Sequence, residues 1–111
     1  MATNYIQPGD VLTLAAPYAV ASGAGMLVGG IFAVALAAAS NGASVQARRG
    51  GVWTLPKLTS DDVTAGAKLY WDNTNKRLTL TSSGNTLVGA ATAAAGTSAT
   101  TVSVMLDGTV R

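Results

Sequence analysis

The chain has 111 residues, which suits a single domain, and only 11% of them are charged, for a net charge of +2. It contains no His, Cys or Glu, so it can build neither a Ser-His-Asp or Cys-His catalytic site nor a zinc site of the usual nitrogen and sulfur ligands. The excess of positive charge is too small and too scattered for a nucleic-acid-binding surface.

Short apolar runs follow one another along the chain, separated by Gly, Asn, Asp and Ser, a pattern typical of β proteins. We predict strands at residues 11–15, 26–28, 31–36, 44–48, 52–55, 68–72, 77–81, 86–91 and 101–106. Eight or nine short strands at close spacing predict an all-β single domain over residues 1–111, a small, jelly-roll-like β-barrel or sandwich. Residues 1–7 lack any core pattern and are a candidate extended N-terminal arm.

Alternation within two of these runs assigns side chains to faces. In residues 77–81, Leu78 and Leu80 are predicted to face the core, with Thr79 and Thr81 facing out. In residues 101–106, Val102, Val104 and Leu106 share one face, opposite Thr101, Ser103 and Met105. One helical turn is predicted near residues 60–65, and the Ala-rich stretches 37–39 and 90–95 could each form a short helix instead of a strand.

Residues 18–39 carry no charge and leave a second interpretation open, a small membrane protein that spans at this segment. Four glycines interrupt the segment, and its strongly apolar part, residues 26–39, is shorter than a membrane helix requires. Two buried strands separated at Gly29-Gly30 account for it better.

Catalytic, metal and cofactor sites are not predicted. Each of the five Asp residues lies in or beside a turn, where Asp is expected to bond to the backbone. Asp61-Asp62 beside Thr59 and Ser60 is only a weak signal for a hard cation, and no phosphate-binding loop is present.

Aromatic and cationic residues provide the candidates for an interaction surface. Trp53, Tyr70 and Trp71 are three of only six aromatic residues, and Arg48-Arg49 is one of two adjacent cation pairs. Such aromatics fill cores, anchor protein interfaces or, with cations between them, stack on single-stranded nucleic acid. We predict these five residues as interface candidates, with the core as the alternative for the aromatics.

Six segments together resemble a family of capsid cement (decoration) proteins of tailed bacteriophages. They are GDVLTLAAP (9–17), SGAGMLVGGIFAVA (22–35), GGVWTLPK (50–57), AGAKLYWDNT (65–74), GNTLVGAA (84–91) and SVMLDG (103–108). The chain departs from that family at Ala33, where Gly is common, and around residues 41–46, which lack the usual acidic residues.

The resemblance implies a structural protein without catalytic residues that binds the outside of an expanded capsid and stabilises contacts between capsomers. Its implied partners are the major capsid protein and further copies of itself, as a dimer or trimer, with no nucleic acid, membrane or small-molecule substrate. The alternative within the virion is another β-module, such as a head-fibre base or a tail component. The N-terminal sequence has no secretory pattern, which predicts synthesis in the host cytoplasm.

Overall fold

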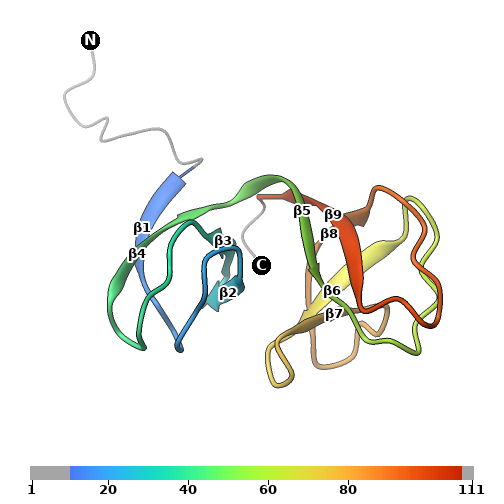
Figure 1. Cartoon of the computed structure of the whole chain (residues 1–111), viewed down its shortest axis with the longest axis horizontal. Helices are drawn as coiled ribbons and strands as arrows, with labels where there is room; N and C mark the ends of the chain where they lie inside the picture. The colour runs from blue at the N-terminus through green and yellow to red at the C-terminus, as the bar shows by residue number, and fades with distance from the viewer. Residues whose placement is uncertain (1–10, 109–111) are drawn as a thin grey trace, which may run out of the picture.

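The computed structural model describes residues 11–108, and within that range the chain forms nine strands and no helix (Figure 1). All strand pairs are antiparallel and belong to two curled sheets. The strands are β1 (Val11–Ala15), β2 (Gly25–Val28), β3 (Ile31–Ala35), β4 (Ser44–Arg48), β5 (Gly50–Pro56), β6 (Lys68–Asp72), β7 (Arg77–Thr79), β8 (Thr86–Ala91) and β9 (Thr101–Asp107). The predicted all-β class is therefore confirmed, whereas the predicted arm, residues 1–7, lies outside the described residues.

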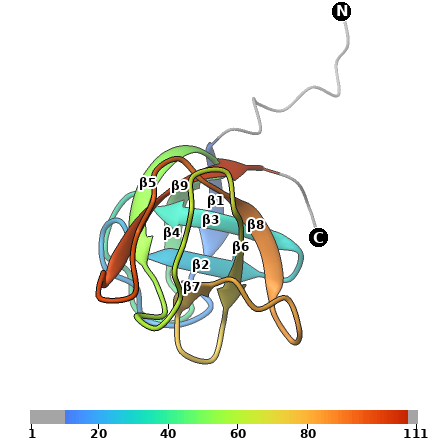
Figure 2. The same ribbon diagram turned by 90° about the vertical axis from the view of Figure 1, so that its right-hand side faces the viewer.

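The chain fills one sheet before it enters the other. The first sheet has the order β1-β4-β3-β2, and the second has the order β5-β9-β8-β6-β7. Only Arg49 separates β4 from β5, so one extended segment passes from the first sheet to the second as the green arch of Figure 1. Seen from the end in Figure 2, the strands of the two sheets cross at a steep angle.

The apolar segment 18–39, which suggested a membrane span, contains the β2–β3 hairpin. Val28 pairs with Ile31 across the Gly29-Gly30 turn, and Gly29 has a φ of 59°, a conformation that glycine adopts at little cost. Among residues 11–108 there is no helix long and apolar enough to cross a membrane.

Trp71 of β6 joins the two sheets. Its ring stands 4.9 Å from that of Phe32 of β3, at an angle of 50° between the planes, and it is 1% exposed. Phe32 and Val34 belong to the same buried cluster as Leu55, Leu69 and other core residues of the second sheet. The main core therefore contains side chains of both sheets, and a smaller cluster around Met26 lies within the first.

The second sheet curls until its two edge strands meet. At one end Lys57 forms a parallel bridge to Leu78, and the Leu58 N–H donates to the Leu78 carbonyl at 2.8 Å. The sheet is thereby closed at this end in the manner of a small barrel, although the rest of β5 keeps an open edge in the described residues.

Three local predictions were wrong, all around this closure. The one helical turn near residues 60–65 does not form, because the segment instead makes turns and a bridge from Val63 to Ala95. Leu80, predicted to face the core, is 36% exposed, since β7 ends at Thr79 and the chain leaves the sheet there. Thr79, predicted to face out, is 4% exposed because the Asp61 carboxylate lies over it and accepts its hydroxyl hydrogen bond.

A close approach of β8 to β9 gives a test of this packing. A Cβ added at Gly89 would lie 2.1 Å from the Met105 carbonyl oxygen, which is backbone and cannot move aside. We expect Gly89→Ala to lower the free energy of unfolding in urea by about 1–3 kcal/mol or more. Gly96→Ala is the control, because nothing lies within 4 Å of a Cβ there; equal effects of the two substitutions would contradict the packing described.

Candidate interaction surface

The outer face of β5 and β9 carries an exposed apolar pair. Because side chains alternate along a strand, the burial of Leu55 on β5 and of Val102, Val104 and Leu106 on β9 turns the intervening residues outward. Val52 and Met105 lie directly opposite each other in the register and are 61% and 50% exposed. They are the two most exposed large apolar side chains of the described residues.

The register extends this pair into a row across the second sheet. Ala90 of β8 lies opposite Met105, and Lys68 of β6 lies opposite Ala90. Thr54 and Ser103 form the next outward pair on β5 and β9. We call the residues Val52, Thr54, Ser103, Met105 and Ala90 the outer face; it is apolar at its centre and carries small or hydroxyl side chains around it.

The predicted interface residues Trp53, Arg48 and Arg49 lie near the passage from β4 to β5. Trp53 is half-buried, packs against the main core and donates its indole N–H to the Gly50 carbonyl at 2.8 Å. A Cβ at Gly51 would be 3.4 Å from the Trp53 ring nitrogen and 4.0 Å from the Arg48 side chain, so these two residues lie over one backbone position. Arg49 donates to the Gly108 carbonyl.

Tyr70 and Trp71 occupy opposite faces of β6. Trp71 points inward and fills the core, the alternative that the sequence left open for the aromatics, and its indole N–H donates to Asn73 Oδ1 at 3.1 Å. Tyr70 is half-buried and lies opposite Thr79 in the register. The structure thus brings Arg48 and Trp53 together but places Tyr70 on a different pair of strands.

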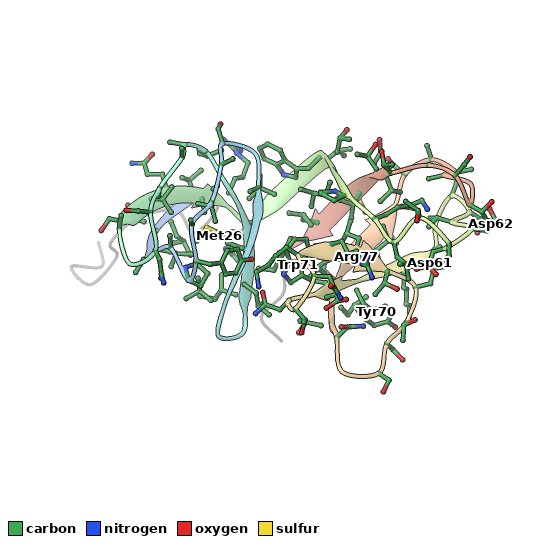
Figure 3. The ribbon with its side chains drawn as sticks, turned by 60° about the horizontal axis from the view of Figure 1, so that its bottom comes forward. Met26, Asp61, Asp62, Tyr70, Trp71 and Arg77 are labelled. Carbon is green, nitrogen blue, oxygen red and sulfur yellow. The ribbon has the colours of Figure 1, made fainter. Side chains whose placement is uncertain are left out.

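Asp61, labelled in Figure 3, and Lys57 form a hydrogen-bonded latch where the second sheet closes. Lys57 is 3% exposed, and its ammonium donates to the carbonyls of Leu58, Thr59 and Asp61 at 2.9, 3.4 and 2.7 Å. The Asp61 carboxylate accepts from the Thr79 hydroxyl at 2.8 Å and from the Leu80 N–H at 2.9 Å. Asp61 therefore holds the loop to β7, and within residues 11–108 no group of three acidic, His or Cys side chains is placed to hold a metal ion.

The neighbouring aspartates allow a matched test of this latch. Asp61→Ala leaves the buried Thr79 hydroxyl and the Leu80 N–H without their acceptor, which we expect to cost about 2–3 kcal/mol of unfolding free energy in urea. Asp62 is exposed, so Asp62→Ala should change it by less than about 0.5 kcal/mol. A larger loss from Asp62→Ala than from Asp61→Ala would contradict the assignment.

Asp72 organises the turn between β6 and β7. Its carboxylate accepts from the Thr74 and Asn75 N–H groups at 3.0 and 3.2 Å and from the Asn75 side-chain amide at 2.8 Å. The hydrogen bonds from Asn75 hold the pKa of this carboxyl below its usual value near 3.8, and Arg77 lowers it a little further. Asp72 thus serves the turn, as the sequence predicts of aspartates in such places.

The lowered pKa of Asp72 predicts how the free energy of unfolding changes as the pH falls. A carboxyl whose pKa is lower in the folded than in the unfolded state stabilises the fold fully above its unfolded pKa of about 3.9. Its contribution disappears as the pH falls through the lower folded value. We expect the stability gap between wild type and Asp72→Ala, measured by urea unfolding, to be constant from pH 7 to 5 and to narrow below pH 4. A gap that stays constant or widens in acid would contradict this role.

The outer face, not the predicted aromatics, is the most exposed apolar part of the described surface, and sequence analysis did not single it out. The sequence did contain a sign of this face, since the alternation in residues 101–106 placed Met105 on the side that points away from the core. What the sequence could not show is that β5 and β9 pair in the register that sets Val52 beside Met105.

Comparison with known proteins places the chain in a family. The family model described as phage cement protein matches residues 6–106, nearly the whole chain. No curated protein and no solved structure matches the chain.

Proposed function

The chain belongs to the phage cement protein family, and on that premise we propose that it binds the outside of an expanded phage capsid and stabilises the contacts between capsomers. Membership gives the chain a structural role in association with the phage capsid. The proposal adds the side of the shell, the contact with the major capsid protein, and synthesis in the host cytoplasm before assembly.

The observation that supports the proposal is the outer face. Val52 and Met105 are two large apolar side chains that lie side by side and exposed, and burying them in an interface would recover the free energy that their contact with water costs. The residues next to the pair are threonine, serine and alanine, and the charged Lys68 and Asp107 lie at the margin of the face, so a second surface can approach its centre closely without desolvating charges.

The sequence-predicted residues take different places in this proposal. Trp53 and Arg48 lie at the β4–β5 passage and, with Arg49 and Tyr70, are proposed as contacts at the margin of the interface. Trp71 is proposed to act from within, by holding the two sheets in the arrangement that presents the outer face.

Capsid symmetry makes weak contacts sufficient. Many copies bound to equivalent positions on a shell act together, so each interface can be modest and the assembly still gains stability. We propose that the chain binds as a dimer or trimer, which also multiplies the contacts of each bound unit.

Co-sedimentation with undecorated, expanded capsids of the phage that encodes the protein tests the proposal. We expect saturable binding at a fixed ratio to the major capsid protein, together with a raised capsid melting temperature. Met105→Asp and Val52→Asp should each weaken binding at least tenfold, because an aspartate in the centre of an apolar interface is buried without a partner.

Leu36→Asp is the matched control, since Leu36 is a large apolar residue 38% exposed beyond the end of β3 in the first sheet. It should leave the binding unchanged. A soluble wild-type protein that does not sediment with the capsids would overturn the proposed function, and full binding by both outer-face variants would remove the outer face from it.

A further inference from the structure

A hollow of about 420 Å³ opens where the two sheets meet. One wall is the loop from Tyr18 to Ala24 with Gly25 of β2, and the other is formed by Pro56, Trp71 and Lys76 of the second sheet. Figure 3 shows Trp71 at this junction. The volume lies within the range of small-molecule pockets, about 300–1,000 Å³.

Small side chains on one wall and a tightly packed floor keep the hollow open. Ala19, Ala21 and Ala24 line the rim, where larger residues would fill the space. At the floor, a Cβ on Gly25 would stand 2.8 Å from a Phe32 ring carbon and 2.9 Å from a Trp71 ring carbon, so the backbone already touches both rings. A floor packed this closely cannot collapse to close the hollow.

The Tyr18 hydroxyl, one of the polar groups of the lining, is used within the fold. The Tyr18 hydroxyl donates to the Gly25 carbonyl at 3.0 Å, which leaves its ring as the surface of the hollow. Burial raises the pKa of Tyr18, so the phenol stays neutral at physiological pH. An occupant therefore meets a largely apolar wall.

Lys76 supplies the only full charge among the residues that line the hollow. Its ammonium lies 4.2 Å above the centre of the Tyr18 ring, across the gap between the sheets, and it also donates to the Asn73 carbonyl. Its backbone φ of 56° lies in the left-handed region, which costs a residue other than glycine about 1–2 kcal/mol. The turn built by Asp72 holds Lys76 in this conformation, and no carboxylate lines the hollow to neutralise it.

We propose that this hollow binds an apolar side chain of the partner protein that is adjacent to a carboxylate, with the carboxylate paired to Lys76. The apolar lining selects the side chain, and the lysine selects an Asp or Glu next to it. The identity of the partner, the major capsid protein, rests on the proposed function, whereas the chemistry of the occupant rests on the hollow itself.

A small probe tests the chemistry without a capsid. N-acetyl-leucine carries an apolar side chain beside a carboxylate, and N-acetyl-leucinamide lacks the charge. In a ¹H–¹⁵N NMR titration of the full chain we expect saturable shifts of the amides of residues 18–25 and of the Trp71 indole N–H. The amide probe should bind at least threefold more weakly, and Lys76→Gln should remove the difference. Shifts absent from these residues, or equal affinities of the two probes for the wild type, would overturn the proposal.

Filling the hollow tests its part in capsid binding. Ala21 is an exposed rim residue, so Ala21→Trp should block the hollow, leave the urea midpoint unchanged and weaken co-sedimentation at least tenfold. Ala94→Trp is the matched control, because Ala94 is exposed in the loop between β8 and β9 and does not line the hollow. Ala19→Trp replaces Ala21→Trp if the latter fails to fold.

The outcomes separate this inference from the proposed function. If the wild type binds capsids and both hollow variants bind equally well, the hollow proposal is wrong and the proposed function stands. If the wild type does not bind capsids, the proposed function fails. The probe titration alone then decides whether the hollow binds an apolar group beside a carboxylate. Loss of self-association in Ala21→Trp, with capsid binding retained, would assign the hollow to a second copy of the chain and overturn the proposal.

Discussion

The contact between Trp71 and Phe32 is the interaction on which the arrangement of the two sheets depends. It joins β6 of one sheet to β3 of the other, and the absence of a side chain at Gly25 allows β2 to lie against both rings. A buried tryptophan removes about 200 Å² of surface from water, which is worth about 5 kcal/mol as an upper estimate. In a domain whose large apolar residues are few, that is a substantial share of the stability.

Strand β3 shows how the two cores share one element. Phe32 and Val34 face the main cluster with the second sheet, whereas Ala33 and Ala35 face the smaller cluster around Met26. A strand covered on both faces needs apolar residues at every position, and here large residues alternate with small ones because the two spaces differ in size. The same requirement produces the continuous apolar run that resembles a membrane span in the sequence.

Several of the few charged residues have a role within the fold. Lys57 and Asp61 close the second sheet, Asp72 builds the turn, and Lys76 stands over Tyr18. The centre of the outer face consists of apolar, hydroxyl and small side chains, and Lys68 and the exposed Asp107 lie only at its margin. Such a surface suits a protein proposed to lie flat against a shell, because close contact there requires little removal of water from ions.

The sequence by itself determined the all-β class and most strand positions, because alternation and turn residues act between neighbours along the chain. It placed Val102, Val104 and Leu106 on the buried face and separated β2 from β3 at the Gly29-Gly30 turn, as the structure has them. It also carried the segments by which the family is recognised. Its expectations for Leu80 and Thr79 were wrong, because the Asp61 side chain from a different segment decides which side is covered at the end of β7. The helical turn expected near residues 60–65 does not form, because that segment makes turns and a bridge from Val63 to Ala95.

Only the tertiary structure decided which strands belong to which sheet and which residues meet where the two sheets join. The pairing of β5 with β9 set Val52 beside Met105, and the packing of Trp71 against Phe32 opened the hollow between Tyr18 and Lys76. Each of these arrangements joins residues tens of positions apart. Alternation constrains which face a side chain takes within its strand, but it carries no information on which strand will lie beside it.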